Sequence, residues 1–429
     1  MNARVETAGP TSSPRADWTD VAHTGPGTLA GRYMRTFWQP ICRAKDLAPG
    51  RAKPIRIMSE DLTLYRGEAQ EGVIPTKGRN PYPTDGGTDS SAPRRNDSDG
   101  SVSGMQGGSP HLLAFRCAHR GTQLSTGWVE GNDLRCFYHG WKYDAAGQCI
   151  EQPAEPEPFC QRIKIRAYPT QEYLGLIFAY LGEGEPPPLP RYPEFEAPGT
   201  IENGAPNVWP CNFFNRLENS PDPVHLAFVH RWSPFTDSGL VGIPQPSGEE
   251  TDYGIEVRAR RPNERVRVTH FHMPNINLIS DSGGAGEGGR EAGVSINLSW
   301  RVPVDDEHCI SFNANHVPPL IGGADLVGAH RRDGDTPSRS ASELAEAVLR
   351  GELRIEDATN VANVVNVQDY VAQIGQGVFA PRAHDHLGHS DVLVILLRHL
   401  WQRELRALAE GRPPKQWRRR GALATAYGV

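Results

Sequence analysis

The sequence predicts a protein of the α+β class, with an all-β first domain followed by a domain of strands and helices. Short strand-like runs bounded by turn residues recur up to residue 181. The proline-rich segment "EGEPPPLPRYPEFEAPG", residues 183–199, is typical of a rigid linker. Beyond it, strand-like runs alternate with segments of helical periodicity. A length of 429 residues allows two or three such domains.

The predicted boundaries are a flexible N-terminus at residues 1–25, a first domain at residues 26–180 and a second at residues 181–429. Within the first domain, residues 68–110 are crowded with Gly, Pro, Ser, Asp and Asn. Such a stretch cannot bury enough apolar surface to offset the entropy of ordering it. We therefore predict a surface insertion there, placed between two strands at residues 62–67 and 111–121 that pair with each other.

The second domain is expected to open with a helix over residues 210–232, "PCNFFNRLENSPDPVHLAFVHRW", which has an apolar face. Four strand-like runs follow at residues 254–261, 265–273, 295–304 and 309–317, with a glycine-rich loop at residues 280–293. Two helices are expected near the end of the chain, at residues 341–352 and 390–411. Asp391 and Gly411 stand at the ends of the last helix, where capping residues are favoured.

Composition excludes several classes of protein. The net charge of −6 and the pI near 6.2 do not favour nucleic-acid binding. The sequence has no run of eighteen apolar residues, so we expect no transmembrane helix. The N-terminus lacks the apolar stretch of a signal peptide. Seven cysteines are an odd count for a disulfide framework and favour a reducing compartment. We expect a soluble, cytoplasmic protein.

Two Cys/His pairs form the strongest motif. "CAHRG" places Cys117 and His119 on one tight loop, and "CFYHGW" places Cys136 and His139 on a second. Zinc fingers usually pair Cys with Cys and His with His along the sequence. A Rieske [2Fe-2S] cluster has two Cys on one iron and two His on the other, which agrees better with one of each per loop. The alternatives are a single zinc ion and four residues with no shared role.

A second motif lies in "NRLENSPDPVHLAFVH", where His225 and His230 follow Asp222. Two histidines and one carboxylate form the facial triad of non-haem Fe(II) oxygenases. Residues five apart on a regular α-helix diverge by about 140°. For both rings to reach one metal, we predict that the helix ends or carries a π-bulge between His225 and His230.

Spacing leaves the third ligand open among Glu218, Asp222 and Asp369. Asp369 is the one acid in the apolar, helix-like segment "NVVNVQDYVAQIGQG". Asp222 followed by Pro223 is also typical of a helix start, with Asp as the N-cap. An ordinary packed or exposed position is the alternative for each histidine and for Asp369.

Together these residues resemble the Rieske non-haem iron ring-hydroxylating oxygenases, specifically catalytic α subunits of the phthalate-dioxygenase-like branch. The resemblance covers most of residues 27–410. Its motifs are "GRYMRTFWQPI", "CAHRGTQLSTGW", "CFYHGWKYD", "ENSPDPVHLAFVH" and "QDYVAQIGQG". It implies an N-terminal all-β Rieske domain and a C-terminal helix-grip catalytic domain, in which helices accompany an antiparallel sheet.

The resemblance also implies the cluster ligands. Cys117 and Cys136 would hold one iron of the [2Fe-2S] cluster, and His119 and His139 would hold the other.

For the second centre, the resemblance implies that His225, His230 and Asp369 bind a mononuclear Fe(II). Asp222 would not be a ligand. It would instead connect His225 to His139 of the partner subunit and carry electrons across the interface of a homotrimer.

The implied activity is hydroxylation of a small aromatic substrate, either an aromatic acid or an aryl ether. It would use O2 and electrons from NAD(P)H, delivered by a ferredoxin and/or a reductase. A monooxygenase or O-demethylase would use the same metals. A Rieske electron-transfer protein is disfavoured because such carriers need only one small domain.

Pocket walls are expected from the strands near residues 269–280 and 295–300 and from Phe228 and Trp232, with Asn277 and Asn297 as polar contacts. Arg258 or Arg260 would suit a substrate carboxylate, although both positions are also typical of exposed strand residues.

Overall fold

The computed structural model describes residues 17–68, 108–232, 242–282, 294–318, 340–358, 364–419 and 421. The first dozen residues, nearly all of the 68–110 insertion and most of the 280–293 loop lie outside the described residues. The chain divides into two compact units. The smaller comprises Ala44–Ile55 and Leu62–Tyr168, and the larger comprises Met1–Arg43, Arg56–Asp61 and Pro169–Val429.

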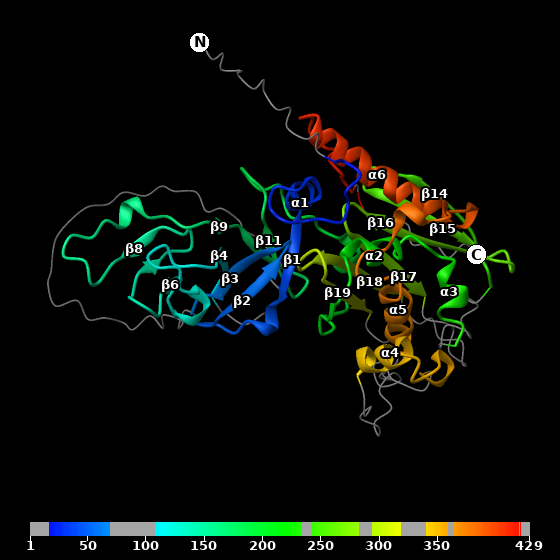
Figure 1. Cartoon of the computed structure of the whole chain (residues 1–429), viewed down its shortest axis with the longest axis horizontal. Coiled ribbons are helices and arrows are strands. Elements are labelled where there is room, and N and C mark those ends of the chain that lie inside the picture. Colours follow the sequence, from blue (N-terminus) through cyan, green and yellow to red (C-terminus); the bar gives the residue numbers. More distant parts are fainter. Residues whose placement is uncertain are drawn as a thin grey trace, which may run out of the picture. The chain divides into compact units, whose positions relative to one another are not determined.

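The smaller unit is built on two four-stranded antiparallel sheets (Figure 1). One has the order β2-β3-β4-β9, with β2 at Ala52–Ile57, β3 at Glu60–Arg66, β4 at Pro110–Ala114 and β9 at Ala167–Tyr168. The other has the order β5-β6-β7-β8, with β5 at Trp128–Glu130, β6 at Asp133–Arg135, β7 at Lys142–Tyr143 and β8 at Cys149–Glu151.

The predicted pairing across the insertion is confirmed, because Leu64 of β3 lies opposite Leu112 of β4 in an antiparallel register. Behind these strands, Leu113, Leu124 and Tyr143 are fully buried in the core of the smaller unit. Cys117 and Cys136 belong to the same core. The paired Cys/His loops are therefore built on a packed apolar base.

The larger unit contains a three-stranded sheet and an eight-stranded antiparallel sheet. The first has the order β1-β11-β10, with bounds Trp38–Arg43, Leu176–Tyr180 and Thr170–Tyr173. The second runs β12-β19-β18-β17-β16-β15-β14, and β13 also pairs with β19. Its bounds are β12 Thr200–Glu202, β13 Val208–Trp209, β14 Gln245–Glu250, β15 Gly254–Arg260, β16 Val266–His272, β17 Ile276–Ser282, β18 Val294–Pro303 and β19 Cys309–Val317.

Helices of the larger unit accompany this sheet, as the α+β prediction required. Their bounds are α1 Leu29–Arg35, α2 Phe213–Glu218, α3 His225–Phe228, α4 Ala341–Leu349, α5 Val364–Ile374 and α6 Val392–Ala409. Figure 1 shows α6, in red, running along β14. Helices α4 and α6 confirm the two predicted C-terminal helices, and Asp391 is the N-cap of α6.

The prediction of a single helix over residues 210–232 is wrong. This segment forms two short helices, α2 and α3, which are separated by residues 219–224. The interruption contains Pro221 and Pro223, which remove backbone donors and disfavour helix in the preceding residues. The helix-like apolar spacing across this segment concealed the break. α3 has Val224 as its N-cap, so Asp222 is not the cap that we predicted.

Side chains alternate along β18 and β19 of the large sheet, so that one face of these strands is apolar and the other is polar. On β18, Leu298, Trp300 and Val302 are buried, whereas Asn297, Ser299 and Arg301 point to the opposite face. Those three pair with Asn315, Asn313 and Ser311 of β19, directly opposite in register. Each pair shares a side-chain hydrogen bond of 2.6–2.8 Å. One face of these strands is thus an apolar core and the other a ladder of polar contacts.

Four aromatic side chains join helices far apart in the sequence. Trp401 of α6 contacts Tyr33 of α1 and Phe213 and Phe214 of α2, with ring centroids 5.2–5.8 Å apart. All four side chains are fully buried, and Trp401 Nε1 donates to Pro274 O at 3.1 Å. This cluster fixes α2, from which the chain continues towards His225.

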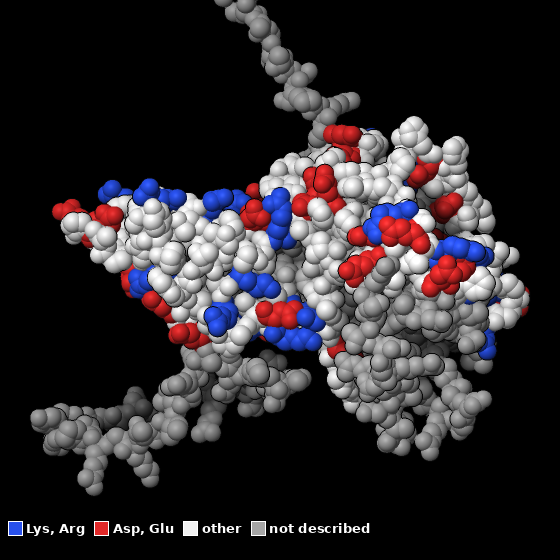
Figure 2. Space-filling view, turned by 60° about the horizontal axis from the view of Figure 1, so that its bottom comes forward, with Lys and Arg blue, Asp and Glu red and all other residues white. Residues whose placement is uncertain are grey.

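Charged side chains are intermixed on the face shown in Figure 2, where basic and acidic groups of the described residues often lie next to each other. Among the described residues, no helix is both long and apolar enough to cross a membrane. All seven cysteines are described, and none forms a disulfide.

Trp401→Ala is expected to lower the free energy of unfolding by ~3–5 kcal/mol, because it leaves a large cavity among three aromatic rings. Chemical denaturation followed by circular dichroism measures the loss. Trp18→Ala is the matched control, since Trp18 is 37% exposed and its truncation should cost less than about 1 kcal/mol. Equal losses in the two variants would contradict this account of the core.

Candidate cluster and metal centres

The two Cys/His loops of the smaller unit share one backbone geometry. In the first, Cys117 N–H donates to Thr122 O at 2.8 Å and Gly121 N–H donates to Cys117 O at 2.9 Å. In the second, Cys136 N–H donates to Trp141 O at 2.8 Å, and Gly140 N–H donates to Cys136 O at 3.1 Å.

A glycine closes each of these loops in the left-handed region, where a side chain would be strained. Gly121 has φ 75° and Gly140 has φ 73°. A Cβ at Gly140 would also lie 2.9 Å from Pro153 Cγ. The sequence therefore repeats one Cys-to-Gly loop, with the histidine two residues after the first Cys and three after the second.

The loops bring like residues together. Cys117 and Cys136 belong to one buried cluster, and the rings of His119 and His139 lie 4.5 Å apart. Within the described part of the chain, these four residues do not converge on one point as a single ion requires. A Cys pair beside a His pair fits a two-iron cluster better than one zinc ion.

The surroundings of these loops also suit a cluster. His119 Nδ1 is buried without a hydrogen-bond partner among the described residues, so a lone pair remains for a metal. The ring of Trp141 stacks on His119 at 4.6 Å. Tyr143 Oη lies 3.2 Å from Cys117 Sγ and accepts from Ala118 N–H at 3.1 Å. These contacts fix the positions of the sulfur and the imidazole.

The histidines of the second centre lie in the larger unit, on either side of the end of α3. The helix stops at Phe228, which confirms the prediction that it ends between His225 and His230. The two imidazole centroids are consequently 5.5 Å apart, close enough for both rings to face one ion. His230 is buried, whereas His225 is partly exposed.

Asp369 of α5 is the acid that lies close to both of these histidines. One ligand atom from each of His225, His230 and Asp369 falls within 4.8 Å of the others. Asp369 Oδ1 lies 3.3 Å from His230 Nε2. Burial would raise the pKa of Asp369, but the contact with His230 and nearby positive charges lower it overall. An ionised carboxylate beside two imidazoles is the donor set that ferrous iron accepts.

Gln368 fixes the orientation of one histidine. Its Oε1 lies 3.0 Å from Nδ1 of His230, and both side chains are buried. This contact leaves Nε2 of His230 directed towards Asp369. Sequence reasoning missed Gln368, although its position next to a candidate ligand was a signal.

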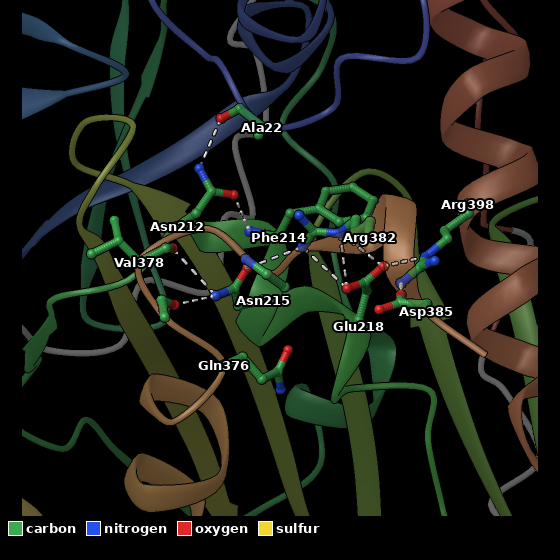
Figure 3. A network of polar contacts seen from close by, with 12 residues as sticks. Ala22, Asn212, Phe214, Asn215, Glu218, Gln376, Val378, Arg382, Asp385 and Arg398 are labelled. Atoms are coloured by element: carbon green, nitrogen blue, oxygen red, sulfur yellow. Dashed lines mark hydrogen bonds and ion pairs between the residues drawn. The ribbon is translucent and has the colours of Figure 1, made fainter. Parts of the chain in front are cut away.

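The two other acids considered as the third ligand are engaged elsewhere. Glu218 pairs with Arg382 at 3.1 Å and with Arg398 at 2.5 Å (Figure 3). Asp222 Oδ1 accepts from Val224 N–H at 2.7 Å, and its Oδ2 lies 3.5 Å from Nδ1 of His225. Asp222 therefore contacts His225 but is not a member of the candidate triad.

Two asparagines hold α2 against the segment that follows α5. Asn212 N–H donates to Val378 O at 2.8 Å. The amide of Asn215 donates to Gly377 O at 3.0 Å and accepts from Ala380 N–H at 3.1 Å. Figure 3 shows these contacts beside the Glu218–Arg382 pair. The network ties α2, which precedes His225, to the segment that follows α5, the helix that carries Asp369.

A cavity of about 230 Å³ opens beside the triad. Its sheet wall includes Val257, Ala259, Thr269, Asn277, Ile279 and Asn297. Asn277 and Asn297, which we predicted as polar contacts, are among its lining residues. Phe228 and Trp232 do not line it and are about half exposed, so those two predictions are wrong.

The cationic residues of the cavity are also not those considered from the sequence. Arg258 and Arg260 are 51% and 61% exposed and pair with Glu256 and Glu264. Arg267 and Arg301 line the cavity instead. The signal for Arg301 was its strand parity, because it lies four residues after Asn297 and so on the same face. Burial and the charge of Arg216 lower the pKa of Arg301 to about 9.

The Rieske [2Fe-2S] domain family matches residues 86–170. The phenoxybenzoate dioxygenase α subunit of Ectopseudomonas oleovorans is 30% identical over 90% of this chain and 84% of its own length. The 5,5'-dehydrodivanillate O-demethylase oxygenase subunit of Sphingobium sp. is 28% identical over 92% of this chain and 81% of its own length.

Among solved structures, the oxygenase in its complex with ferredoxin from carbazole 1,9a-dioxygenase has a TM-score of 0.54 at 17% identity. The match covers 92% of this chain and 94% of that one. It shows the shared fold of a Rieske domain and a catalytic domain.

The Cys/His loops, the histidine–carboxylate group and relatives matched over most of their length therefore point to one family. Relatives across most of the chain are oxidoreductases that combine a Rieske cluster with a mononuclear iron. This chain belongs to the Rieske non-haem iron oxygenases, as an α subunit of the phthalate-dioxygenase-like type.

Proposed function

We propose that the protein is the oxygenase component that hydroxylates a small aromatic compound, and that its side chains hold two metal centres. Cys117, Cys136, His119 and His139 hold the [2Fe-2S] cluster, and His225, His230 and Asp369 hold the mononuclear iron. The convergence of this last group beside a cavity is the observation that carries the proposal. When bound, the two centres supply electrons and activate O2.

The cavity determines what the chain itself contributes to catalysis. Val257, Ala259 and Ile279 offer an apolar surface for a ring, and Asn277 and Asn297 offer hydrogen bonds that orient it. A volume of about 230 Å³ is below the roughly 300–1,000 Å³ of typical drug-sized sites. This size favours a substrate with one aromatic ring. Hydroxylation of a ring and hydroxylation of an ether methyl, which leads to O-demethylation, need the same donor set.

Asp222 is proposed to link the centres of adjacent subunits. Its carboxylate lies 3.5 Å from Nδ1 of His225 and is partly exposed, so it can accept a hydrogen bond from a second imidazole. That imidazole would be His139 of the partner subunit in a homotrimer. A carboxylate between two imidazoles holds both rings and shortens the path for an electron.

The proposed electron donors are a ferredoxin and/or an NAD(P)H-dependent reductase. The carbazole 1,9a-dioxygenase oxygenase, which shares this fold, forms a complex with a ferredoxin. In the smaller unit, Phe137 and Tyr138 precede His139 and are more than half exposed, as is Trp128. Exposed aromatic groups next to a cluster ligand suit contact with another protein.

Asp369→Ala is expected to remove the mononuclear iron, because two neutral imidazoles remain without the charged ligand. Iron should fall from about three to about two per chain while acid-labile sulfide stays near two. The electron paramagnetic resonance signal of a nitric oxide complex at the mononuclear site should disappear. Asp357→Ala, at an exposed acid of the same unit, should keep all the iron. Full iron in Asp369→Ala would contradict the ligand assignment.

Asp222→Ala is expected to leave both metal centres bound and to lower turnover about 100-fold or more, because the link between subunits is lost. Product formed per minute and iron content are measured on the same samples. Asp305→Ala is a matched control, since Asp305 contacts His308 at the same three-residue spacing, 2.9 Å away. Near-normal turnover in Asp222→Ala would refute the bridging role.

A further inference from the structure

An arginine stands immediately before each cysteine of the two Cys/His loops, and both arginines make the same contact. Arg116 Nη1 donates to Gly121 O at 2.9 Å, and Arg135 Nη1 donates to Gly140 O at 2.9 Å. In each loop the acceptor lies five residues after the arginine and belongs to the closing glycine. The chain therefore repeats one device, in which an arginine before the cysteine holds the glycine that ends the loop.

These contacts complete the closure of both loops. The N–H of each closing glycine donates to the carbonyl of the loop's cysteine, at 2.9 Å in the first loop and 3.1 Å in the second. The carbonyl of the same glycine accepts from the guanidinium of the arginine. Glycine is the residue with the widest choice of backbone angles. Fixing both of its polar groups to the start of the loop therefore removes the main freedom of that loop.

The charge of Arg135 is balanced by its own sheet. Arg135 of β6 forms ion pairs of 2.7 Å with Glu130 of β5 and with Glu151 of β8. Lys142 of β7 lies 3.4 Å from each of these carboxylates. The hydrogen bond from Arg135 lowers the pKa of Glu130 and of Glu151, so both are ionised at neutral pH. The second loop is thus fastened to three strands by a neutralised guanidinium.

The charge of Arg116 has no comparable balance. Its side chain is exposed, and no carboxylate in the described part of the chain forms an ion pair with it. Its guanidinium carbon lies 5.5 Å from the centre of the Phe115 ring. The hydrogen bond to Gly121 nonetheless holds this guanidinium against the loop that carries Cys117 and His119. Because arginine keeps its proton, a permanent positive charge is fixed beside the first loop.

We propose that both arginines are positioning residues for the [2Fe-2S] cluster, and that Arg116 also raises its reduction potential. Arg135 fastens the second loop to the sheet, and Arg116 fastens the first loop and keeps an unbalanced charge there. A reduced cluster carries one more negative charge than an oxidised cluster, so a nearby cation stabilises the reduced form. This inference rests on the proposed function, because it takes the two Cys/His loops as the cluster site.

The first test is a redox titration of the whole protein, purified without air and followed by the visible absorption of the cluster. Arg116→Gln removes the charge and keeps an amide that can donate a hydrogen bond. At one applied potential, its ratio of reduced to oxidised cluster should be about threefold below that of the wild-type protein. Iron and acid-labile sulfide should be unchanged. Arg116→Lys keeps the charge, and its ratio should stay within about 1.5-fold of wild type.

Salt separates an effect of charge from an effect of structure. The Debye length falls from about 30 Å at 0.01 M salt to about 3 Å at 1 M. The difference between wild-type protein and Arg116→Gln should therefore be largest at low salt and shrink at least about twofold at high salt. Arg51→Gln is the matched control, since Arg51 is an exposed arginine of the same unit that precedes β2 of the other sheet. Its titration should match that of the wild-type protein.

The second test measures how long the cluster survives when the protein is incubated with a chelator in air. Arg135→Gln frees the carbonyl of Gly140 and removes a partner of Glu130 and Glu151, so the half-life of the cluster absorbance should fall at least about threefold. Arg51→Gln should keep the wild-type half-life. Arg135→Lys keeps the charge without the forked donor and should give an intermediate half-life. This variant decides the matter if Arg135→Gln does not fold.

Three results would overturn the proposal. A wild-type titration curve in Arg116→Gln, or a difference that persists in full at 1 M salt, would contradict the role of the Arg116 charge. A wild-type cluster half-life in both Arg135 variants would contradict the positioning role. Wild-type protein that contains no acid-labile sulfide would count against the proposed function, whereas unchanged titrations and half-lives in fully loaded variants count against this inference alone.

Discussion

The proposed catalytic centre of this protein depends on one constraint, because a single metal ion binds only ligands that lie close around it. Three ligand atoms must lie within a few ångströms, yet they come from two segments far apart in the chain, around α3 and within α5. Two prolines end α2 early and let the chain turn, so that the short α3 begins at His225 and ends two residues before His230. The Asn215 and Glu218–Arg382 contacts hold α2 against the segment after α5. The positions of the three candidate ligands are thus set by helix interruptions and buried polar contacts.

The large sheet supplies the other half of the site. Strand alternation gives β18 a core face of Leu298, Trp300 and Val302 and a pocket face of Asn297, Ser299 and Arg301. Hydrogen bonds across to β19 satisfy these polar groups and fix their positions. Arg301 of this ladder lines the same cavity as His225, His230 and Asp369. The same arrangement therefore supports the fold and forms one wall of the cavity beside His225, His230 and Asp369.

Features formed by residues close together in the sequence could be predicted, whereas features that depend on distant residues could not. The cluster loops are local, because Cys117 to His139 spans two short turns, and their spacing alone indicated the cofactor. The end of the helix before His230 followed from helix geometry. The break between α2 and α3 was missed because apolar spacing concealed the effect of Pro221 and Pro223. Arg301 was missed for a different reason: a polar residue on a strand looks the same whether it faces water or a cavity. Only the partners across the sheet distinguish the two cases.

The most direct test of the two-centre account is the iron and acid-labile sulfide content of the wild-type protein purified without air. The account predicts about three irons and about two sulfides per chain, two of the irons in the cluster and one at the triad. Zinc without sulfide would contradict the assignment of Cys117, His119, Cys136 and His139, and the oxygenase mechanism would fall with it. Two irons with two sulfides would contradict the metal site at His225, His230 and Asp369.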